Sequence, residues 1–263
     1  NFAILVNNDN LNTMENKTVI YEQAVTEQTR VCLKIEQFFK RIDDLIQIDS
    51  PWACESLTRA IVDIVTVFYR PDIKSKLSKQ LHHLAEELTK HLFSPYCEKE
   101  QTEELLSCIE KYQQFLLKTE GKLLQGLRND SLLKTIRHCL SQPSGPCSHD
   151  APAMHQWLNK SFEERHQNID HWLQLLNPIR AIVTVILHVL RESVSFRGKN
   201  TETGHYTQNL KTLKDCQLIR IKLPKNSFVY PEISAGRRHL NIRFMQDDTP
   251  SNEKIAFELS TCH

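Results

Sequence analysis

Glycine is scarce in this chain, and the motifs that depend on it are missing. Only 6 of the 263 residues are glycine, which disfavours glycine-rich phosphate loops and large β-barrels. The signatures GxSxG, HExxH, Walker A and GxGxxG do not occur in the sequence. We therefore expect no enzymatic activity and no bound cofactor.

Long apolar runs are also missing. The longest, 181–187, lies between Arg180 and His188 and is far shorter than the about 20 residues that a membrane-spanning helix needs. We therefore expect no membrane as a partner. Residues 1–13 have neither the positive segment nor the cleavage signature of a secretory leader. We expect them to be a disordered extension or an artefact of the gene start.

No CxxC pair occurs among the eight cysteines, which favours reduced, buried thiols and a cytoplasmic protein. Cys147, His149 and His155 cluster in sequence, but no second ligand pair follows at zinc spacing. A Cys147 nucleophile with His155 as its base would need an orienting group and an oxyanion site, and nothing specifies them. We expect no metal site and no catalytic residue.

The first half of the chain has a helical pattern. Between residues 26 and 49, apolar residues recur at spacings of three and four, which is the stripe of an amphipathic helix. Three similar segments follow, and a shorter helix is expected after Asp130. The four long helices are predicted at 26–49, 53–69, 72–92 and 98–119. Because short links join them, they predict a helical bundle.

Further helices are expected after a proline-rich break at 142–152. Ser161 and Glu164 have the spacing of a capping box. Asn177 before Pro178 has the form of an N-cap followed by proline at the first helical position, so we predict that a new helix begins there. This last helix, ending at Ser193, is apolar nearly all round and should be central and buried.

Beyond Phe196 the pattern changes from helix to strand. Residues 197–214 are polar and look like a loop, and alternating segments follow at 217–223, 239–245 and 255–259. The predicted fold class is α+β and mainly α, with a helical bundle and a small antiparallel sheet near the C-terminus. The expected domains are a helical one over 14–196 and a strand-rich one over 197–263 that packs on it.

The stretch YPEISAGRRHLNIRFM, residues 230–245, predicts a hairpin with an informative return strand. Its apolar residues Leu240, Ile242 and Phe244 share one face, because side chains alternate along a strand. The opposite face presents His239 and Arg243. If the sheet buries the first set, it displays a basic surface on the other side.

Positive charge is concentrated in the same part of the chain. Residues 180–245 hold twelve Lys and Arg against four Asp and Glu, although the formal net charge of the whole chain is +1. Segregated positive potential accelerates association with acidic partners, and nucleic acid, acidic peptide and anionic lipid all remain open. Nucleic acid is disfavoured, because no aromatic residues alternate with the cations of the strand and the helical half is acidic.

Several ordered segments together resemble the ZapD family of bacterial cell-division proteins. They are LKIEQFF (33–39), LRND (127–130), PCSHDAPAMHQWL (146–158), the segment 176–197 and YPEISAGRRHLNIRFM (230–245). The resemblance implies a helical domain with a β domain, and a cytoplasmic homodimer. It also implies binding to the acidic C-terminal tail of the tubulin-like protein FtsZ, so that the dimer cross-links and bundles FtsZ filaments at the division site.

The resemblance also implies which residues bind the FtsZ tail. Carried over by position, these are Lys34, Arg128, His155, Arg238, His239 and Arg243. The family often has a basic residue where this chain has Ser131, and arginine where it has His239; Lys134 and Arg238 are neighbouring cations. The alternative function is a nucleic-acid-binding module that uses the same basic surface.

Overall fold

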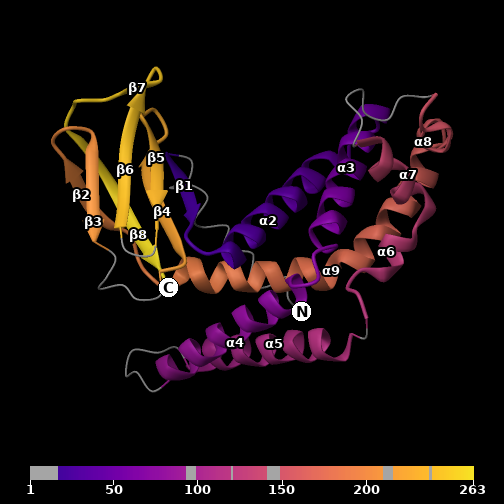
Figure 1. The fold of residues 1–263 in the computed structure, drawn as a ribbon, viewed down its shortest axis with the longest axis horizontal. Helices are drawn as coiled ribbons and strands as arrows, with labels where there is room; N and C mark the ends of the chain where they lie inside the picture. Colours follow the sequence, from indigo (N-terminus) through magenta and orange to yellow (C-terminus); the bar gives the residue numbers. More distant parts are fainter. Residues whose placement is uncertain (1–16, 93–98, 120, 141–148, 210–215, 237–238) are drawn as a thin grey trace. The chain divides into compact units, whose positions relative to one another are not determined.

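The structure is a computed structural model that describes residues 17–92, 99–119, 121–140, 149–209, 216–236 and 239–263. The chain divides into two compact units. The strand unit comprises residues 1–30 and 188–263, and the helical unit comprises residues 31–187 (Figure 1). The α+β, mainly α fold class is confirmed. The predicted extension 1–13 and Arg238 lie outside the described residues.

Helices form the helical unit, as the apolar periodicity predicts. Their bounds are α2 (Glu27–Leu45), α3 (Pro51–Val67), α4 (Ile73–Leu92), α5 (Lys99–Lys118), α6 (Gln125–Asn129), α7 (Ser131–Leu140), α8 (Pro152–Leu158) and α9 (Phe162–Glu192). The four long helices predicted in the first half correspond to α2 to α5. Helices α4 and α5 pack side by side (Figure 1). Buried residues such as Ile35, Ile61, Leu81 and Ile109 form the core side of each stripe.

The predicted helix start at Asn177 is wrong, because α9 is one continuous helix of 31 residues with Pro178 inside it. Proline in a helix interior removes a hydrogen bond and costs about 3 kcal/mol. Burial of Leu176 and Ile179 on either side of the proline offsets this cost, at about 1.5–3 kcal/mol for each large apolar side chain. The predicted burial of this helix is confirmed by Ile182, whose exposed fraction is 0%.

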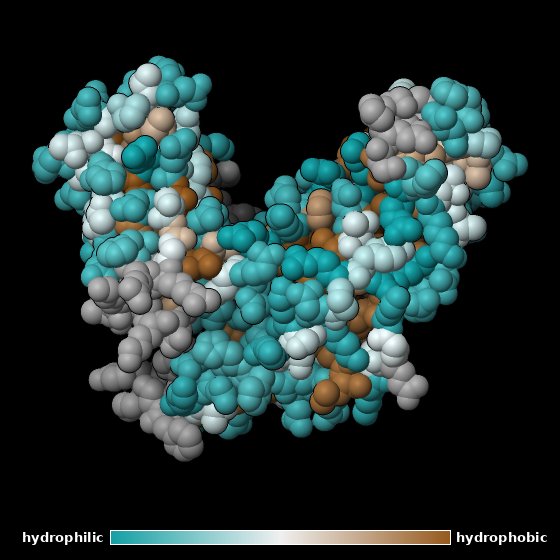
Figure 2. Space-filling model, in the orientation of Figure 1, coloured by the Kyte–Doolittle hydropathy of each residue, from teal (hydrophilic) through white to brown (hydrophobic). Residues whose placement is uncertain are grey.

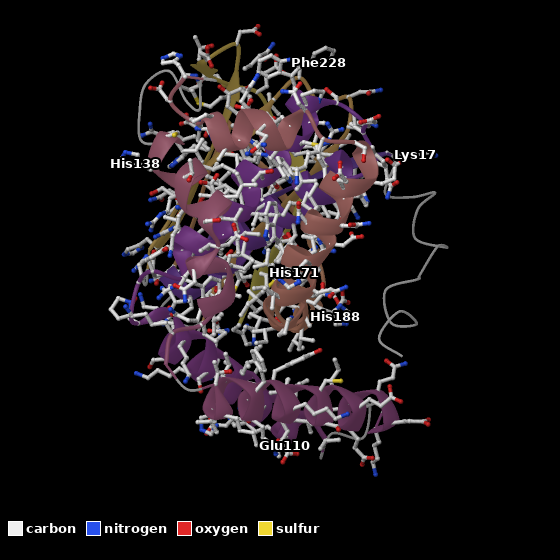
Figure 3. All side chains as sticks on the ribbon, turned by 90° about the vertical axis from the view of Figure 1, so that its right-hand side faces the viewer. Lys17, Glu110, His138, His171, His188 and Phe228 are labelled. Atoms are coloured by element: carbon white, nitrogen blue, oxygen red, sulfur yellow. The ribbon has the colours of Figure 1, made fainter. Side chains whose placement is uncertain are left out.

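By length and composition, α9 is the one helix of the described residues that is apolar enough to cross a membrane. Its apolar side chains are largely covered by the protein itself, including Ile186 and Leu187, each 0% exposed. His171 and His188 are exposed along the same helix (Figure 3). A core helix passes the same length and composition test, and the burial of its side chains is typical of one.

Short polar contacts fix the junction of α7, α8 and α9. The capping box is confirmed, since Ser161 Oγ accepts from the Glu164 backbone N–H at 3.3 Å and Glu164 Oε2 accepts from the Ser161 N–H at 3.3 Å. Asp130 acts twice. Its Oδ1 accepts from the Leu133 N–H at 2.9 Å and caps α7, and its Oδ2 accepts from Trp172 Nε1 at 3.1 Å.

The strand unit contains two antiparallel sheets. Their strands are β1 (Thr18–Ala24), β2 (Arg197–Thr201), β3 (His205–Asn209), β4 (Leu218–Pro224), β5 (Tyr230–Ala235), β6 (His239–Gln246), β7 (Thr249–Pro250) and β8 (Ile255–Cys262). Sheet A has the order β1-β4-β8-β2, and sheet B has the order β3-β6-β5, with β7 paired to β6.

The two sheets share one apolar core, so the unit is a β-sandwich. Leu240, Ile242 and Phe244 of β6 are each 0% exposed, which confirms the predicted inward face of this strand. They cluster with the inward residues of β4 and β8, and the Phe244 ring centroid lies 5.0 Å from that of Phe257. This packing holds the outward residues of β6 in place.

Besides the two-residue β7, the strand unit contains three strands that are not expected from the sequence. β1, from the region assigned to the helical domain 14–196, pairs with β4 in the register Glu22 to Arg220. β2 and β3 occupy the stretch 197–214, so the predicted loop is wrong over Arg197–Thr201 and His205–Asn209. Each of the three lies at the edge of its sheet, where one face or side is solvated and the sequence pattern is weak.

The Asp130 side chain generates a prediction about stability. In Asp130→Ala, α7 loses its N-cap and the buried Trp172 N–H loses its acceptor, so we expect the free energy of unfolding to fall by about 2–4 kcal/mol. Urea unfolding followed by circular dichroism measures this loss. Asp170→Ala, at an exposed position of α9, should change stability by less than about 0.5 kcal/mol. Equal stability of the two variants would contradict this role for Asp130.

Candidate functional site

The outward face of sheet B is polar and includes two of the predicted site residues. It comprises His205, Thr207 and Asn209 of β3, His239, Asn241 and Arg243 of β6, and Tyr230, Glu232 and Ser234 of β5, all of them exposed. We call these nine residues the sheet B surface. Its positive charge comes from Arg243, and His205 lies directly opposite Arg243 in the register of the sheet.

Arg243 is at the centre of the sheet B surface and its side chain is free. In the register of the sheet it lies between His205 on β3 and Glu232 on β5. Its guanidinium makes no hydrogen bond or ion pair with any residue that the structure describes. Because Ile242 and Phe244 are fully buried on either side, the backbone of Arg243 is fixed while its side chain remains available to a partner.

His239 shares this face with Arg243. The two residues are four positions apart on one strand, which separates them by about 13 Å along the strand. His239 is exposed, and its carbonyl accepts a hydrogen bond at 3.0 Å from the backbone N–H of Gly236. His239 therefore presents its side chain at the start of β6, and Arg243 presents its side chain near the middle of the strand.

Lys34 and His155 belong to the helical unit and are both exposed. Lys34 lies on α2 beside the buried Ile35, with no hydrogen bond or ion pair to a described residue. His155 lies on α8, and its Nε2 is 3.4 Å from the Asn159 side-chain nitrogen. The neighbouring Trp157 is buried and donates from Nε1 to Asn168 at 3.0 Å, so it anchors α8.

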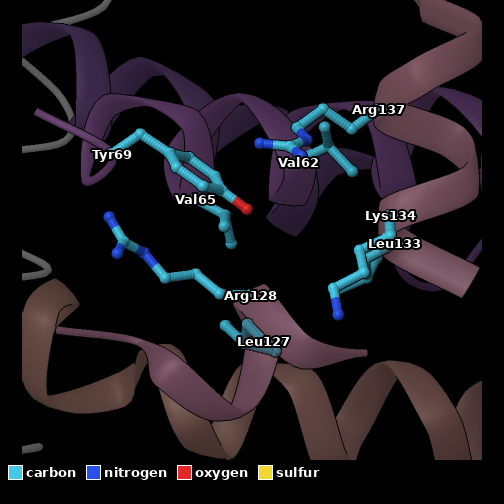
Figure 4. Close-up of a pocket in the computed structure, with 8 residues that line it drawn as sticks. All are labelled: Val62, Val65, Tyr69, Leu127, Arg128, Leu133, Lys134 and Arg137. Atoms are coloured by element: carbon cyan, nitrogen blue, oxygen red, sulfur yellow. The ribbon is translucent and has the colours of Figure 1, made fainter. Parts of the chain in front are cut away.

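Arg128 differs from the other predicted residues because it is buried, with 6% of its surface exposed. Its Nη2 donates to the Phe68 carbonyl, and its guanidinium carbon lies 4.4 Å from the ring centroid of Tyr69. Arg137 lies 4.3 Å from the same centroid, and Figure 4 shows one guanidinium on each side of the ring. A partner can therefore reach Arg128 only through a pocket.

A pocket of about 360 Å³ in the helical unit borders Arg128. It is not the pocket drawn in Figure 4, although Tyr69 and Arg128 line both. Besides Arg128, it is lined by three cations that the sequence analysis misses, namely Arg70, Lys74 and Lys122. They come from the turn after α3, the first turn of α4 and the segment before α6. No short motif contains them, so only the tertiary fold brings them together.

Internal ion pairs use much of the positive charge counted between residues 180 and 245. Arg180 contacts Asp43 at 2.7 Å, Arg191 and Arg220 contact Glu22 at 2.7 and 3.1 Å, and Lys222 contacts Glu258 at 3.3 Å. These cations stabilise the fold and are less available to a partner. The local charge excess in the sequence therefore overstates the positive charge that the protein can present.

Metal binding and thiol chemistry find no support in the part of the chain that the structure describes. It contains no group of three His, Cys, Asp or Glu side chains that could hold a metal ion, although Cys147 lies outside the described residues. Burial raises the pKa of the Cys32 and Cys216 thiols to about 12. Both thiols therefore stay protonated at neutral pH and are poor nucleophiles.

Large exposed apolar side chains occur singly on different elements. Phe228, 88% exposed, lies in the turn between β4 and β5 (Figure 3), Trp52 begins α3 and Leu117 ends α5. Hydrophilic residues cover most of the face seen in Figure 2. Scattered exposed apolar residues are normal on a protein surface, so none of them marks a binding site by itself.

Comparisons with known proteins point to one family. The family model ZapD, described as a cell division protein, matches residues 33–243. A Coxiella burnetii protein named cell division protein ZapD is 33% identical over 93% of this chain and 98% of its own length. Proteins of the same name from Cronobacter sakazakii and Azoarcus sp. are 31% and 30% identical over 93% of this chain and 98% and 99% of their own lengths. With a family match over most of its length and relatives aligned nearly end to end, the chain belongs to the ZapD family of cell division proteins.

Proposed function

We propose that this protein binds the acidic C-terminal tail of FtsZ and, as a cytoplasmic homodimer, cross-links FtsZ filaments at the division site. The proposal depends on one observation about Arg243, which lies on the sheet B surface. Its backbone is fixed by the buried residues on either side, and its guanidinium has no partner among the described residues. An arginine presents a planar set of donors that can bind a carboxylate through two hydrogen bonds. The proposal involves recognition and assembly and includes no catalytic step.

The composition of the sheet B surface favours a peptide over a nucleic acid. Tyr230 is its one aromatic residue, and its hydroxyl donates to Asp248 Oδ1 at 2.8 Å. Single-stranded nucleic acids are usually bound by several aromatic side chains on which bases stack. Apart from Tyr230, Arg243 and Glu232, the surface consists of Thr, Asn, Ser and His, which can donate to carboxylates and backbone carbonyls.

Lys34 and His155 extend the proposal to the helical unit. Each is exposed and lies beside a buried anchor, Ile35 for Lys34 and Trp157 for His155. Both can contact acidic side chains of the tail. Arg128 and His239 are retained as proposed tail contacts, with Arg128 acting from within its pocket, and Arg238 is retained from the sequence alone.

Bundling requires two sites in one particle. A two-fold symmetric dimer provides a second tail site without any further sequence. Two linked sites raise the effective concentration of the second contact, so weak individual sites can still hold two filaments together.

The central test is Arg243→Glu. Loss of a charge-assisted hydrogen bond, worth about 1.5–3 kcal/mol, should weaken binding of an FtsZ tail peptide by about 10- to 100-fold. The introduced carboxylate also repels the acidic tail. Peptide affinity is measured by fluorescence anisotropy, and bundling by co-sedimentation with FtsZ filaments.

The matched control is Arg197→Glu. Arg197 is also an exposed arginine on a strand, but it belongs to sheet A. The Arg197→Glu variant should keep a peptide dissociation constant within about twofold of the wild-type value, which corresponds to a change in binding free energy of at most about 0.4 kcal/mol. Normal bundling by an Arg243→Glu protein with an unchanged circular dichroism spectrum would refute the assigned surface. A DNA mobility shift at moderate salt that depends on Arg243 would instead support the nucleic-acid alternative.

Glu232→Gln should act in the opposite direction. Glu232 is directly opposite Arg243 in the sheet register, where opposed side chains have Cβ atoms about 5 Å apart. Its carboxylate repels an acidic peptide and competes for the guanidinium, so its neutralisation should strengthen peptide binding by about two- to fivefold. Anisotropy titrations at low and high salt measure the effect. A weaker complex in Glu232→Gln would show that the peptide does not approach Arg243 from this face.

The dimer is tested independently of FtsZ. We expect a particle of twice the chain mass at micromolar concentration, because a single tail site per particle cannot cross-link filaments. Light scattering coupled to size-exclusion chromatography measures the mass. A monomer that nevertheless bundles FtsZ would contradict the two-site mechanism.

A further inference from the structure

The pocket beside Arg128 is unusual in its charge. It is formed within the helical unit by Phe68, Tyr69, Arg70, Lys74, Lys122 and Arg128, among others, and no acidic residue lines it among those that the structure describes. Its volume of about 360 Å³ lies at the lower end of the about 300–1,000 Å³ typical of small-molecule sites. Four cations from separate segments therefore surround a space of small-molecule size.

Three of these cations have no acidic partner among the residues that the structure describes. Lys74 donates to the Thr119 carbonyl at 2.7 Å, and neither Lys122 nor Arg128 forms an ion pair with a described residue. Arg70 lies 3.6 Å from Asp72, a carboxylate that also contacts Lys76 at 2.6 Å. The hydrogen bond from Lys76 lowers the pKa of Asp72, so this carboxylate is held mainly by a lysine that does not line the pocket.

Arg128 itself has no counter-charge among the described residues. The residue is 6% exposed, and one buried donor, Nε, has no hydrogen-bond partner among the described residues. The Phe68 carbonyl and the Tyr69 ring supply only partial negative charge. A buried cation without an anion is unfavourable, and an anion in the pocket would satisfy both the free donor and the charge.

We propose that this pocket binds a small anion bearing a phosphate group. A phosphate carries up to two negative charges and several acceptor oxygens, which suits a guanidinium fork together with lysine ammonium groups. The small volume favours a small molecule over a folded partner. The site differs from the sheet B surface, and among the proposed FtsZ-tail residues it includes only Arg128.

The test uses the full-length protein with inorganic phosphate as the probe. Phosphate should raise the thermal unfolding midpoint progressively, because a ligand that binds only the folded state stabilises it. Sodium chloride and sodium acetate at equal ionic strength should not. Isothermal titration calorimetry with phosphate then gives the dissociation constant.

Lys122→Glu is the principal variant, because Lys122 is exposed and its replacement should not disturb folding. We expect its phosphate affinity to fall at least about tenfold. Arg128→Met should also abolish the response, provided that its circular dichroism spectrum matches wild type. Lys111→Glu on α5 makes the same charge change at an exposed position outside the pocket and should bind phosphate normally.

Two results would overturn the proposal. One is an equal response to acetate and phosphate, which would remove the assignment to phosphate; the other is unchanged phosphate binding by Lys122→Glu. Arg243→Glu should keep full phosphate affinity, because Arg243 does not line this pocket. Phosphate binding and FtsZ bundling are thereby tested by different variants, and either proposal can fail without the other.

Discussion

The pairing of β1 with β4, fixed by the carboxylate of Glu22, is the constraint on which the strand unit depends. Arg191 donates from Nε and Nη2 to the two oxygens of Glu22 at 2.9 and 2.7 Å, and Arg220 donates to one of them at 3.1 Å. All three side chains are at most 21% exposed, so loss of the carboxylate would leave two guanidinium groups poorly solvated. A strand from the start of the chain thus completes a sheet that is otherwise built from C-terminal residues. Sheet A in turn supplies Phe257, on which Phe244 packs, and Phe244 fixes the position of Arg243.

The elements predicted correctly from sequence are those whose burial imposes a regular pattern. The amphipathic stripes of α2 to α4 and the alternation of β6 each bury most of one face, so sequence period and structure agree. β1 is different because most of its residues are half-buried, which leaves little alternation to detect. The polar β2, with the sequence RGKNT, is an edge strand. At Pro178 the local sequence favours the start of a new helix. The structure instead continues α9 through the proline, because the residues on both sides of it are buried in the core.

For the candidate site, the sequence could indicate residue types but not their surroundings. The outward position of Arg243 follows from alternation alone, whereas its neighbours His205 and Glu232 follow from strand register, which a single sequence does not determine. Arg128 shows most clearly that the sequence does not reveal the surroundings of a residue. Resemblance places it among the tail contacts, yet the structure buries it against Tyr69. The pocket cations Arg70, Lys74 and Lys122 lie on segments that meet only after folding, so no spacing rule could have grouped them.

Charge in this protein has two separate roles, and the presence or absence of a partner distinguishes them. The first group consists of largely buried arginines that form ion pairs with carboxylates of the same chain, namely Arg165, Arg191 and Arg220. Because these ion pairs are internal, the three arginines stabilise the fold and are not available to a partner. Lys34 and Arg243 have no such partner in the described part of the chain and can be used in recognition. Arg128 combines the two conditions, since it is buried like the first group and lacks an anion like the second. A buried cation in this state gains more from an incoming anion than an exposed one does, because the surrounding protein screens the attraction less than water would. The unpaired cations therefore indicate, more directly than net charge does, where this protein can bind acidic partners.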